Sequence, residues 1–327
     1  MFAYTISSVM LASFFGVPVT PHNDSSSDNV QVVSQLATER LGDDAQRSLE
    51  AAIRLGRLGG VGLPVLSAAA RDYREEIRAN AAAGIRELAA TVPEAVDVLL
   101  PLLTDKSERV VREACVALAA FGRGGQPAVK CLVKLLQTGN SSLAEAAAFA
   151  LRGIGPAARD AEAALAGAAT RFANDRSLAC YEVVRALESV GIRDAKTVRA
   201  LVPLLQTGDA LLTVAAADAI GRAGELGALA APALRPLLQS RDSEVRLAAA
   251  VALGRVVGGD EPVHVLLELI ADTDGEVRLG AVLGLEELGS RANKAIPSLR
   301  AVAERDRDEA VRSAAAAAIQ TIQSAVR

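Results

Sequence analysis

The stretch that decides the fold lies in the second half of the chain: Asp242-Ser-Glu-Val-Arg-Leu-Ala-Ala-Ala-Val-Ala-Leu-Gly254. Val245, Ala249 and Ala252 lie eight, four and one residues before Leu253. This spacing traces one stripe along an α-helix, because side chains three or four positions apart share a helix face. The small side chains in the stripe let a neighbouring helix approach closely. The stretch therefore predicts a helix that packs on other helices along an alanine-rich face.

The same stripe recurs from about residue 30 to the last residue. The Leu or Ile that corresponds to Leu253, called the anchor here, occurs at nine positions separated by 30 to 36 residues: Leu55, Ile85, Leu118, Leu151, Leu187, Ile220, Leu253, Leu285 and Ile319. Alanine stands four residues before eight of these anchors, and Val183 takes this place before the remaining one, Leu187. A period of this length indicates a repeat architecture, in which units bury their apolar faces by stacking on one another.

A shorter helix is predicted before the anchor helix in each unit. Apolar segments end fifteen residues before six of the anchors, at Leu103, Leu136, Phe172, Leu205, Leu238 and Ile270. Prolines suited to the first turn of these first helices are Pro64, Pro93, Pro127, Pro232, Pro262 and Pro297. A second proline recurs at one repeat position, as Pro101, Pro203 and Pro236, and predicts a kink that those units share.

Capping residues mark both ends of the anchor helix, which is the second helix of each unit. The candidate N-caps, eleven residues before the anchors, are Asp44, Ser107, Asn140, Asp209, Asp242, Asp274 and Asp308. The candidate glycines at the C-terminal ends of these helices are Gly59, Gly122, Gly155, Gly191, Gly224 and Gly289. The predicted fold is all-α: a right-handed α-solenoid of about nine helical hairpins.

Three segments resemble one known family. The segment from Asp242 to Gly254, and the similar ones at 274–285 and 308–319, resemble the short HEAT repeat that also occurs in phycobilisome lyase-like proteins. The resemblance extends over residues 30–327 and is strongest after residue 196, whereas the units around Leu55 and Leu187 depart from it. It implies a solenoid whose second helices line a concave face that binds partners.

The N-terminal region differs in composition from the repeats. Residues 1–19 contain no charged side chain, and residues 20–29 form a polar linker. The first 19 residues are compatible with an export signal or a short anchor, although no basic residue precedes Arg40, and also with a disordered apolar tail or a mis-assigned start. The location is therefore either cytoplasmic or exported. No other segment is apolar enough over a sufficient length to span a bilayer.

Composition excludes several classes of function. The chain has 327 residues, a formal charge of −4, no Trp, three Cys and two His. It lacks the basic excess of proteins that bind nucleic acid through phosphates, and we expect no nucleic-acid partner. Three cysteines form no disulfide framework, and Cys115, Cys131 and Cys180 are expected to be buried small apolar residues.

The motifs that suggest chemistry have structural interpretations. The repeated pairs of Asp and Arg four residues apart, Asp242 with Arg246 and its equivalents in the next two units, are expected to be helix caps and ion pairs within one helix. The segment 272–275 resembles only the beginning of a calcium loop, and the glycine clusters at 59–62 and 122–125 are expected to be turns between repeats. We expect no catalytic, cofactor or metal site.

Some relatives of the HEAT family are enzymes. The iron-dependent hydroxylases of similar architecture carry several His-Glu pairs, and this chain has none. The DNA glycosylases use a basic groove with aromatic residues, which this composition does not provide. A phycobilin lyase-like or chaperone-like role on a chromophore protein stays open as the alternative function. A pigment-binding assay would test it.

The face opposite the core stripe is the candidate binding surface. It comprises the positions six and two residues before each anchor and one after. The candidate residues are Arg112, Glu145, Phe149, Arg152, Tyr181, Arg185, Glu188 and Asp218. Aromatic and arginine side chains of this kind are enriched at interface hot spots. Val116, Leu247, Val251 and Leu279 occupy the same rows and either extend a partner groove or pack between stacked helices, and packing is favoured. The sequence thus predicts a non-catalytic scaffold or adaptor for protein partners.

Overall fold

The computed structural model describes residues 45–174 and 178–325. All regular elements in those residues are α-helices or short 3-10 helices, so the fold is all-α. The predicted leader, the linker, residues 30–44 of the predicted solenoid and the N-cap Asp44 lie outside the described residues. Within the described part of the chain, no helix has both the length and the apolar character needed to cross a membrane.

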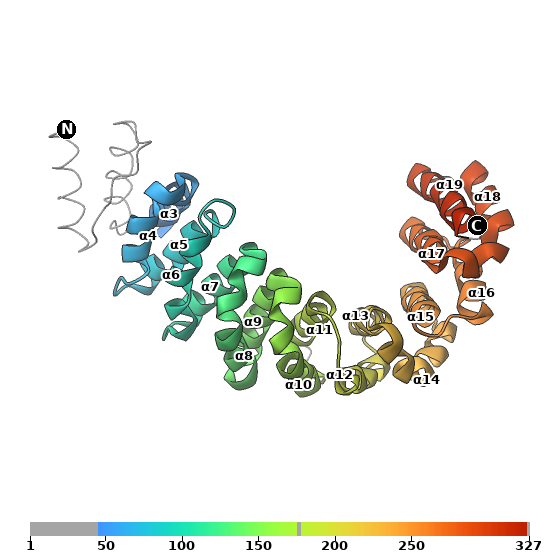
Figure 1. Ribbon diagram of the computed structural model, residues 1–327, viewed down its shortest axis with the longest axis horizontal. Helices are drawn as coiled ribbons and strands as arrows, with labels where there is room; N and C mark the ends of the chain where they lie inside the picture. The colour runs from blue at the N-terminus through green and yellow to red at the C-terminus, as the bar shows by residue number, and fades with distance from the viewer. Residues whose placement is uncertain (1–44, 175–177, 326–327) are drawn as a thin grey trace. The chain divides into compact units, whose positions relative to one another are not determined.

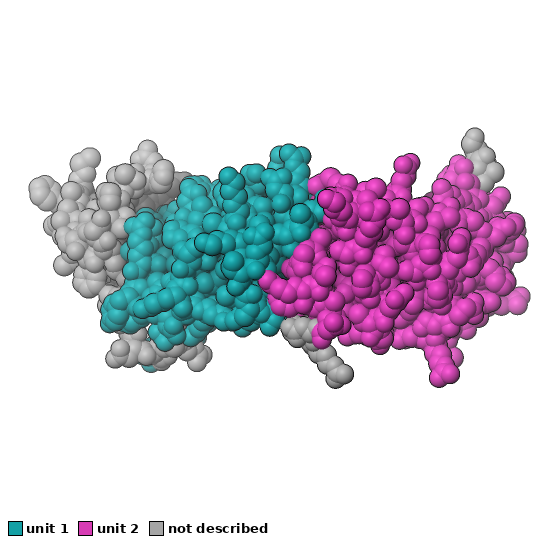
Figure 2. All heavy atoms as spheres, turned by 90° about the horizontal axis from the view of Figure 1, so that it is seen from below, with its two compact units in different colours: residues 1–165 teal, residues 166–327 magenta. Residues whose placement is uncertain are grey.

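The chain divides into two compact units, residues 1–165 and 166–327, which Figure 2 colours separately. In unit 1 the second helices are α3 (Ala45–Arg57), α5 (Glu75–Arg86), α7 (Glu108–Ala120) and α9 (Ser141–Ile154). The first helices are α4 (Leu63–Ala69), α6 (Val96–Leu99), α8 (Val129–Thr138) and α10 (Glu162–Phe172), the last of which runs across the boundary. Each second helix packs on the next, α3 on α5, α5 on α7 and α7 on α9.

Unit 2 repeats this arrangement. Its second helices are α11 (Leu178–Val190), α13 (Ala210–Gly221), α15 (Ser243–Val256), α17 (Gly275–Leu288) and α19 (Glu309–Ser324), and each packs on the next. Its remaining first helices are α12 (Ala195–Leu201), α14 (Ala231–Leu234), α16 (Asp260–Leu269) and α18 (Ile296–Arg305). Within this unit, α13, α15, α17 and α19 lie on the inner side of the curve, and α14, α16 and α18 lie on the outer side (Figure 1).

The predicted anchors form the core. The eight anchors from Leu55 to Leu285 are at most 3% exposed, whereas Ile319 in the last described repeat is half-buried. The alanines four residues before the anchors in the same stripe are also buried, which allows close approach between second helices. Gly153 of α9 shows how close this approach is, because a Cβ there would lie 2.5 Å from the carbonyl oxygen of Ala119 on α7.

The recurring inner prolines interrupt the first helices, as predicted. Pro101, Pro203 and Pro236 lie in the 3-10 segments η3 (Pro101–Thr104), η6 (Val202–Gln206) and η8 (Arg235–Gln239), which begin within two residues of the ends of α6, α12 and α14. Proline has no N–H to donate and its ring crowds the preceding turn, so an α-helix does not continue regularly through it. These first helices are therefore short α-helices that tighten into 3-10 turns.

The predicted caps are largely confirmed. The side chains of Asn140, Asp209, Asp242, Asp274 and Asp308 accept hydrogen bonds from backbone N–H groups in the first turns of α9, α13, α15, α17 and α19. Ser107 is an exception, because its side chain caps nothing and its own N–H donates to Asp105 Oδ1 at 2.8 Å. All six predicted C-terminal glycines have positive φ, between 51° and 90°. That backbone conformation is accessible to glycine at little cost.

The predicted ion pairs between Asp and Arg four residues apart are wrong. The Arg278 guanidinium donates to both carboxylate oxygens of Asp306, 28 residues further along the chain, at 2.9 Å each. Its remaining nitrogen donates to the carbonyls of Asp272 and Thr273, in the turn before α17. Side chains on a helix point toward its N-terminus, so the arginine reaches that turn while Asp274 is engaged in capping. We call this arrangement the arginine clamp.

The clamp recurs in unit 1 and links successive repeats. Arg78 donates to the two oxygens of Asp105 at 2.6 and 2.7 Å and to the carbonyls of Asp72 and Tyr73 at 2.9 and 3.0 Å. This pairing lowers the pKa of the Asp105 carboxyl, chiefly through the hydrogen bonds from Arg78. Arg246 makes a looser version, in which its Nη2 lies 3.9 Å from the Asp272 carboxylate. The arginine clamp is therefore a structural element that repeats.

Candidate protein-interaction surface

The eight predicted surface residues lie on four second helices, in two groups. Arg112 of α7 and Glu145, Phe149 and Arg152 of α9 belong to unit 1, and Tyr181, Arg185 and Glu188 of α11 and Asp218 of α13 belong to unit 2. Arg112 is exposed, and the other seven are half-buried. Half-burial is expected on this face, because within each unit these second helices pack on one another, α7 on α9 and α11 on α13.

In unit 1, Phe149 and Arg152 form a combined surface. The guanidinium carbon of Arg152 lies over the Phe149 ring, 4.9 Å from its centroid. A cation–π contact of this kind contributes about 0.5–1 kcal/mol at an accessible site and holds both side chains in place. The result is an ordered patch in which an aromatic ring and a positive charge lie next to each other.

In unit 2, the charged residues form a network between helices. Glu188 accepts from Arg185 at 2.5 Å and pairs with Arg222, the residue directly after α13, at 2.8 Å. Arg255 of α15 pairs with Glu287 of α17 at 2.6 Å. These pairs connect α11 with the end of α13 and α15 with α17, so Arg222 and Arg255 are already engaged with carboxylates.

Asp218 differs from the other acids of this network. Within the described residues its carboxylate makes neither a hydrogen bond nor an ion pair. Burial raises the pKa of Asp218, repulsion from Glu188 adds to the rise, and attraction from Arg255, Arg222 and Arg185 opposes it. Asp218 therefore holds a carboxylate in a partly desolvated position where a further cation would stabilise the charge.

A groove extends beside Asp218 across α13, α15 and α17. It has a volume of about 350 Å³, and its lining residues are Val214, Asp218, Glu244, Leu247, Ala248, Val251, Glu276, Val277 and Gly280. Gly280 shapes its floor, because a Cβ at that position would lie 2.5 Å from Leu247 Cδ2. Leu247 and Val251 therefore pack on the neighbouring helix, as favoured from the sequence, and at the same time line the groove. We call it the α13–α15–α17 groove.

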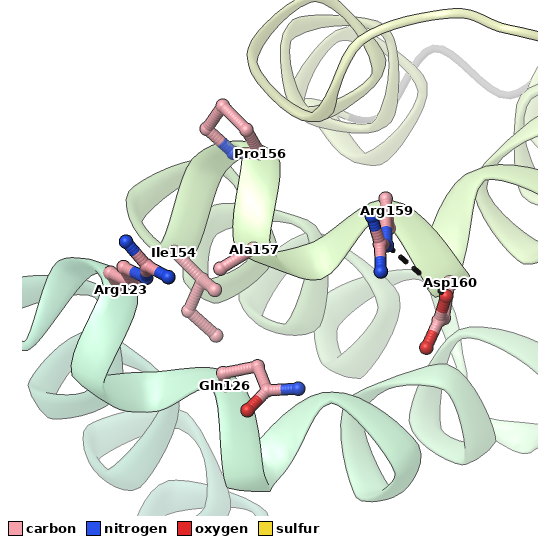
Figure 3. A pocket seen from close by; sticks show the side chains of 7 residues that line it. All are labelled: Arg123, Gln126, Ile154, Pro156, Ala157, Arg159 and Asp160. Carbon is pink, nitrogen blue, oxygen red and sulfur yellow. Dashed lines mark ion pairs between the residues drawn. The ribbon is translucent and has the colours of Figure 1, made fainter.

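A second hollow, in unit 1, lies between two turns that connect repeats. It measures about 580 Å³ and is lined by Arg123 and Gln126 of η4 (Gly122–Ala128), Ile154 of α9, and Pro156, Ala157, Arg159 and Asp160 of η5 (Gly155–Ala161) (Figure 3). The Arg159 and Asp160 side chains, 4.0 Å apart, are 72% and 86% exposed. The glycine cluster that supplies Arg123 is a turn between repeats, as predicted, and the hollow is the gap between two such turns.

The remaining candidates for chemistry are isolated from one another. No three His, Cys, Asp or Glu side chains within residues 45–174 and 178–325 lie together in a way that could hold a metal ion. Cys115 and Cys180 are buried as predicted, and burial raises the pKa of the Cys115 thiol to about 12. Cys131 is only half-buried, which corrects the prediction for that residue. His264 lies exposed on α16, 3.3 Å from Glu268.

Two acidic residues of the groove were not among the residues predicted from the sequence. Glu244 and Glu276 each lie nine residues before an anchor, outside the three rows of the candidate binding surface. Leu178 and Leu211 occupy the same row in α11 and α13. All four lie one helical turn N-terminal to the row six residues before the anchors, on the candidate binding face. The signal in the sequence is the presence of leucine on this row, at Leu178 and Leu211, which the structure leaves 60% and 55% exposed.

Comparison with known proteins identifies the repeat. The family described as HEAT repeats matches residues 63–152 and 231–320, together more than half of the chain. No curated protein sequence matches the chain. Among solved structures, it is similar to the Kap95:Nup1 complex, with a TM-score of 0.66 and 14% identity over 98% of this chain and 48% of that chain.

This chain is also similar to importin beta, solved in an ammonium sulfate condition. The TM-score is 0.61, with 12% identity over 90% of this chain and 48% of that chain. The chain thus spans about half the length of each of these two proteins. At this level of identity the likeness is one of fold, and both similarities agree with an all-α solenoid.

Proposed function

Because the chain belongs to the HEAT-repeat family and is a helical-repeat scaffold, we propose that it is a non-catalytic adaptor that binds protein partners along the open face of its second helices. The observation that carries the proposal is the exposure of large apolar side chains on that face. Leu49, Leu178, Leu211 and Leu283 lie on α3, α11, α13 and α17 and are 37–60% exposed. Such side chains cost free energy in water unless a partner covers them.

The composition of the predicted residues supports the same function. An aromatic ring and a guanidinium group lie on the same helix in two places, Phe149 with Arg152 on α9 and Tyr181 with Arg185 on α11, and in the first of these the two groups are in contact. Aromatic and arginine side chains contribute most of the affinity at many protein interfaces. Kap95, whose fold this chain shares, is found in a complex with Nup1, so protein binding is compatible with a solenoid of this kind.

The test is affinity capture of the full chain from its native cells, followed by mass spectrometry. The double variant Phe149→Ala/Tyr181→Ala should lose the partner, because both rings lie half-exposed on the proposed face. Tyr73→Ala is a matched control, since this aromatic side chain is 83% exposed in the turn before α5 and should retain the partner.

Thermal unfolding of both variants completes the experiment. A double variant that melts close to the wild type and loses its partner supports the proposal. Capture that is equal for wild type and double variant contradicts it. A large drop in melting temperature for the double variant also contradicts it, because the two rings would then serve the core and not a partner.

A further inference from the structure

We propose that the α13–α15–α17 groove binds a short amphipathic segment of a partner protein, in which apolar side chains are flanked by lysine or arginine. This inference rests on the proposed function and specifies the chemistry of the partner. It depends on three properties of the groove: an apolar floor, exposed apolar side chains next to it, and a lining in which every charge is negative.

The floor provides contacts for apolar side chains. Val214, Leu247 and Val251 line it and are half-buried, so each presents part of its surface to the groove. Gly280 allows Leu247 to lie across α17, and Gly284 does the same for Val251, whose Cγ2 would be 2.9 Å from a Cβ at that position. The floor is thus made of side chains fixed by contacts with a neighbouring helix, and a partner that covers it removes further apolar surface from water.

Exposed leucines continue the apolar surface beyond the groove. Leu211 lies three residues before Val214 on α13 and is 55% exposed, and Leu283 lies three residues after Gly280 on α17 and is 47% exposed. Residues three apart share a helix face, so both leucines lie one turn from the groove on the same side. The apolar contacts therefore extend across three helices. With helix axes about 8–10 Å apart, this distance is about 20 Å, or roughly six extended residues of a partner.

The negative charges of the lining favour a partner segment with positive charge. Asp218, Glu244 and Glu276 come from three different helices, and the lining contains no lysine or arginine. None of the three makes an ion pair within the described residues, whereas Arg222 and Arg255 nearby are paired with Glu188 and Glu287. A basic side chain in the partner would therefore meet carboxylates that have no ion-pair partner of their own. An acidic partner would meet repulsion from three directions.

Asp218 shows that the acidic lining is not explained by helix stability alone. Glu244 and Glu276 lie in the first turns of α15 and α17, where negative charge favours the helix in any case. Asp218 lies in the last turn of α13, three residues before Gly221, where the helix dipole disfavours a carboxylate. It is also partly desolvated, and its pKa is raised mainly for that reason. A cation from a partner would offset both costs.

The experiment selects peptides from a random library displayed on phage, using the full chain as bait. Peptides recovered on the wild type should combine apolar residues with Lys or Arg. Their affinity, measured by fluorescence anisotropy, should fall on the order of tenfold or more for Glu244→Lys/Glu276→Lys, since both substituted side chains are exposed and line the groove. Glu225→Lys reverses an exposed charge in a turn outside the groove and should leave the affinity unchanged.

Two outcomes would overturn the inference: recovered peptides without enrichment in Lys or Arg, or equal affinity for wild type and the doubly reversed variant. A melting curve of the doubly reversed variant that matches the wild type separates lost binding from lost folding. If native capture still depends on Phe149 and Tyr181 while the peptides fail, the groove inference falls and the adaptor function stands. If capture is also insensitive to Phe149 and Tyr181, both fall.

Discussion

At the scale of single residues, two aspartates with opposite pKa shifts have opposite effects on stability. The folded protein raises the pKa of Asp218, mainly through burial, so the ionised form is less favourable in the native state than in the unfolded chain. As pH rises from the ordinary aspartate pKa of about 3.9 through the raised pKa of the folded state, this site therefore lowers the free energy of unfolding. The penalty is fully present at higher pH.

We predict that Asp218→Asn increases the free energy of unfolding at neutral pH, because the amide has a similar shape and no charge to desolvate. Urea unfolding of wild type and variant at several pH values would measure this effect. The difference should disappear at low pH, where Asp218 is protonated in both states. A variant that is less stable at neutral pH would show that the charge of Asp218 stabilises the fold.

Asp105 is expected to behave in the opposite way. Its pKa is lowered, chiefly by the hydrogen bonds from Arg78, so its contribution to stability is present above about pH 4 and is lost as pH falls through the lowered value. Arg78→Ala should cost about 3 kcal/mol of unfolding free energy, because it removes two turn contacts and leaves Asp105 without its partner at a site where the two side chains are 8% and 11% exposed.

Arg109→Ala is the control for the clamp, since Arg109 is exposed on α7 and should change stability by less than about 0.5 kcal/mol. Chemical unfolding at neutral and acid pH provides both measurements. Equal losses for the two variants, or an Arg78→Ala variant that keeps the acid-dependent step of the wild type, would refute the structural role of the clamp.

At the scale of elements, the distance between second helices is set by small residues. Gly153 of α9 faces the backbone of Ala119, and a Cβ there would lie 2.6 Å from Ala119 Cα, so Gly153→Ala must push α9 away from α7. We expect a loss of about 1–3 kcal/mol. Gly167 of α10 has no atom within 4 Å of an added Cβ, and Gly167→Ala should gain about 0.5–1 kcal/mol from helix propensity.

Thermal unfolding of the two glycine variants tests this account of helix packing, and each serves as the control for the other. The expected result is a shift of opposite sign. Shifts of the same sign, or a Gly153→Ala variant as stable as the wild type, would show that the second helices are not held at the spacing described.

The elements were predictable from sequence to the extent that they depend on local spacing. The anchors, the C-terminal glycines and the proline interruptions involve residues within one unit, and the structure confirms them. The clamp between Arg278 and Asp306 was missed because its partner lies in the next repeat, at a distance no helical periodicity suggests. The α13–α15–α17 groove was missed for a similar reason, since it depends on which rows of three helices lie next to one another.

At the scale of the whole molecule, the repeats share one core pattern and differ on the open face of their second helices. The stripe of anchors and alanines and the arginine clamp occur in both units and account for stacking. The open face of the second helices varies from repeat to repeat, with Phe149 and Arg152 in unit 1 and the acidic groove in unit 2. A scaffold that repeats its core while varying its surface can specify a partner without a catalytic centre.

The most direct test of this account is photo-crosslinking in native cells from single positions of the full chain. A photoreactive amino acid is placed at Leu211 or Leu283, on the open face of α13 and α17, or at Leu229 in the turn η7 (Gly224–Ala230), where exposure is similar at 48%. We expect one partner protein to crosslink from Leu211 and Leu283 and not from Leu229. A partner that crosslinks from Leu229 alone, or equally from all three positions, would contradict it.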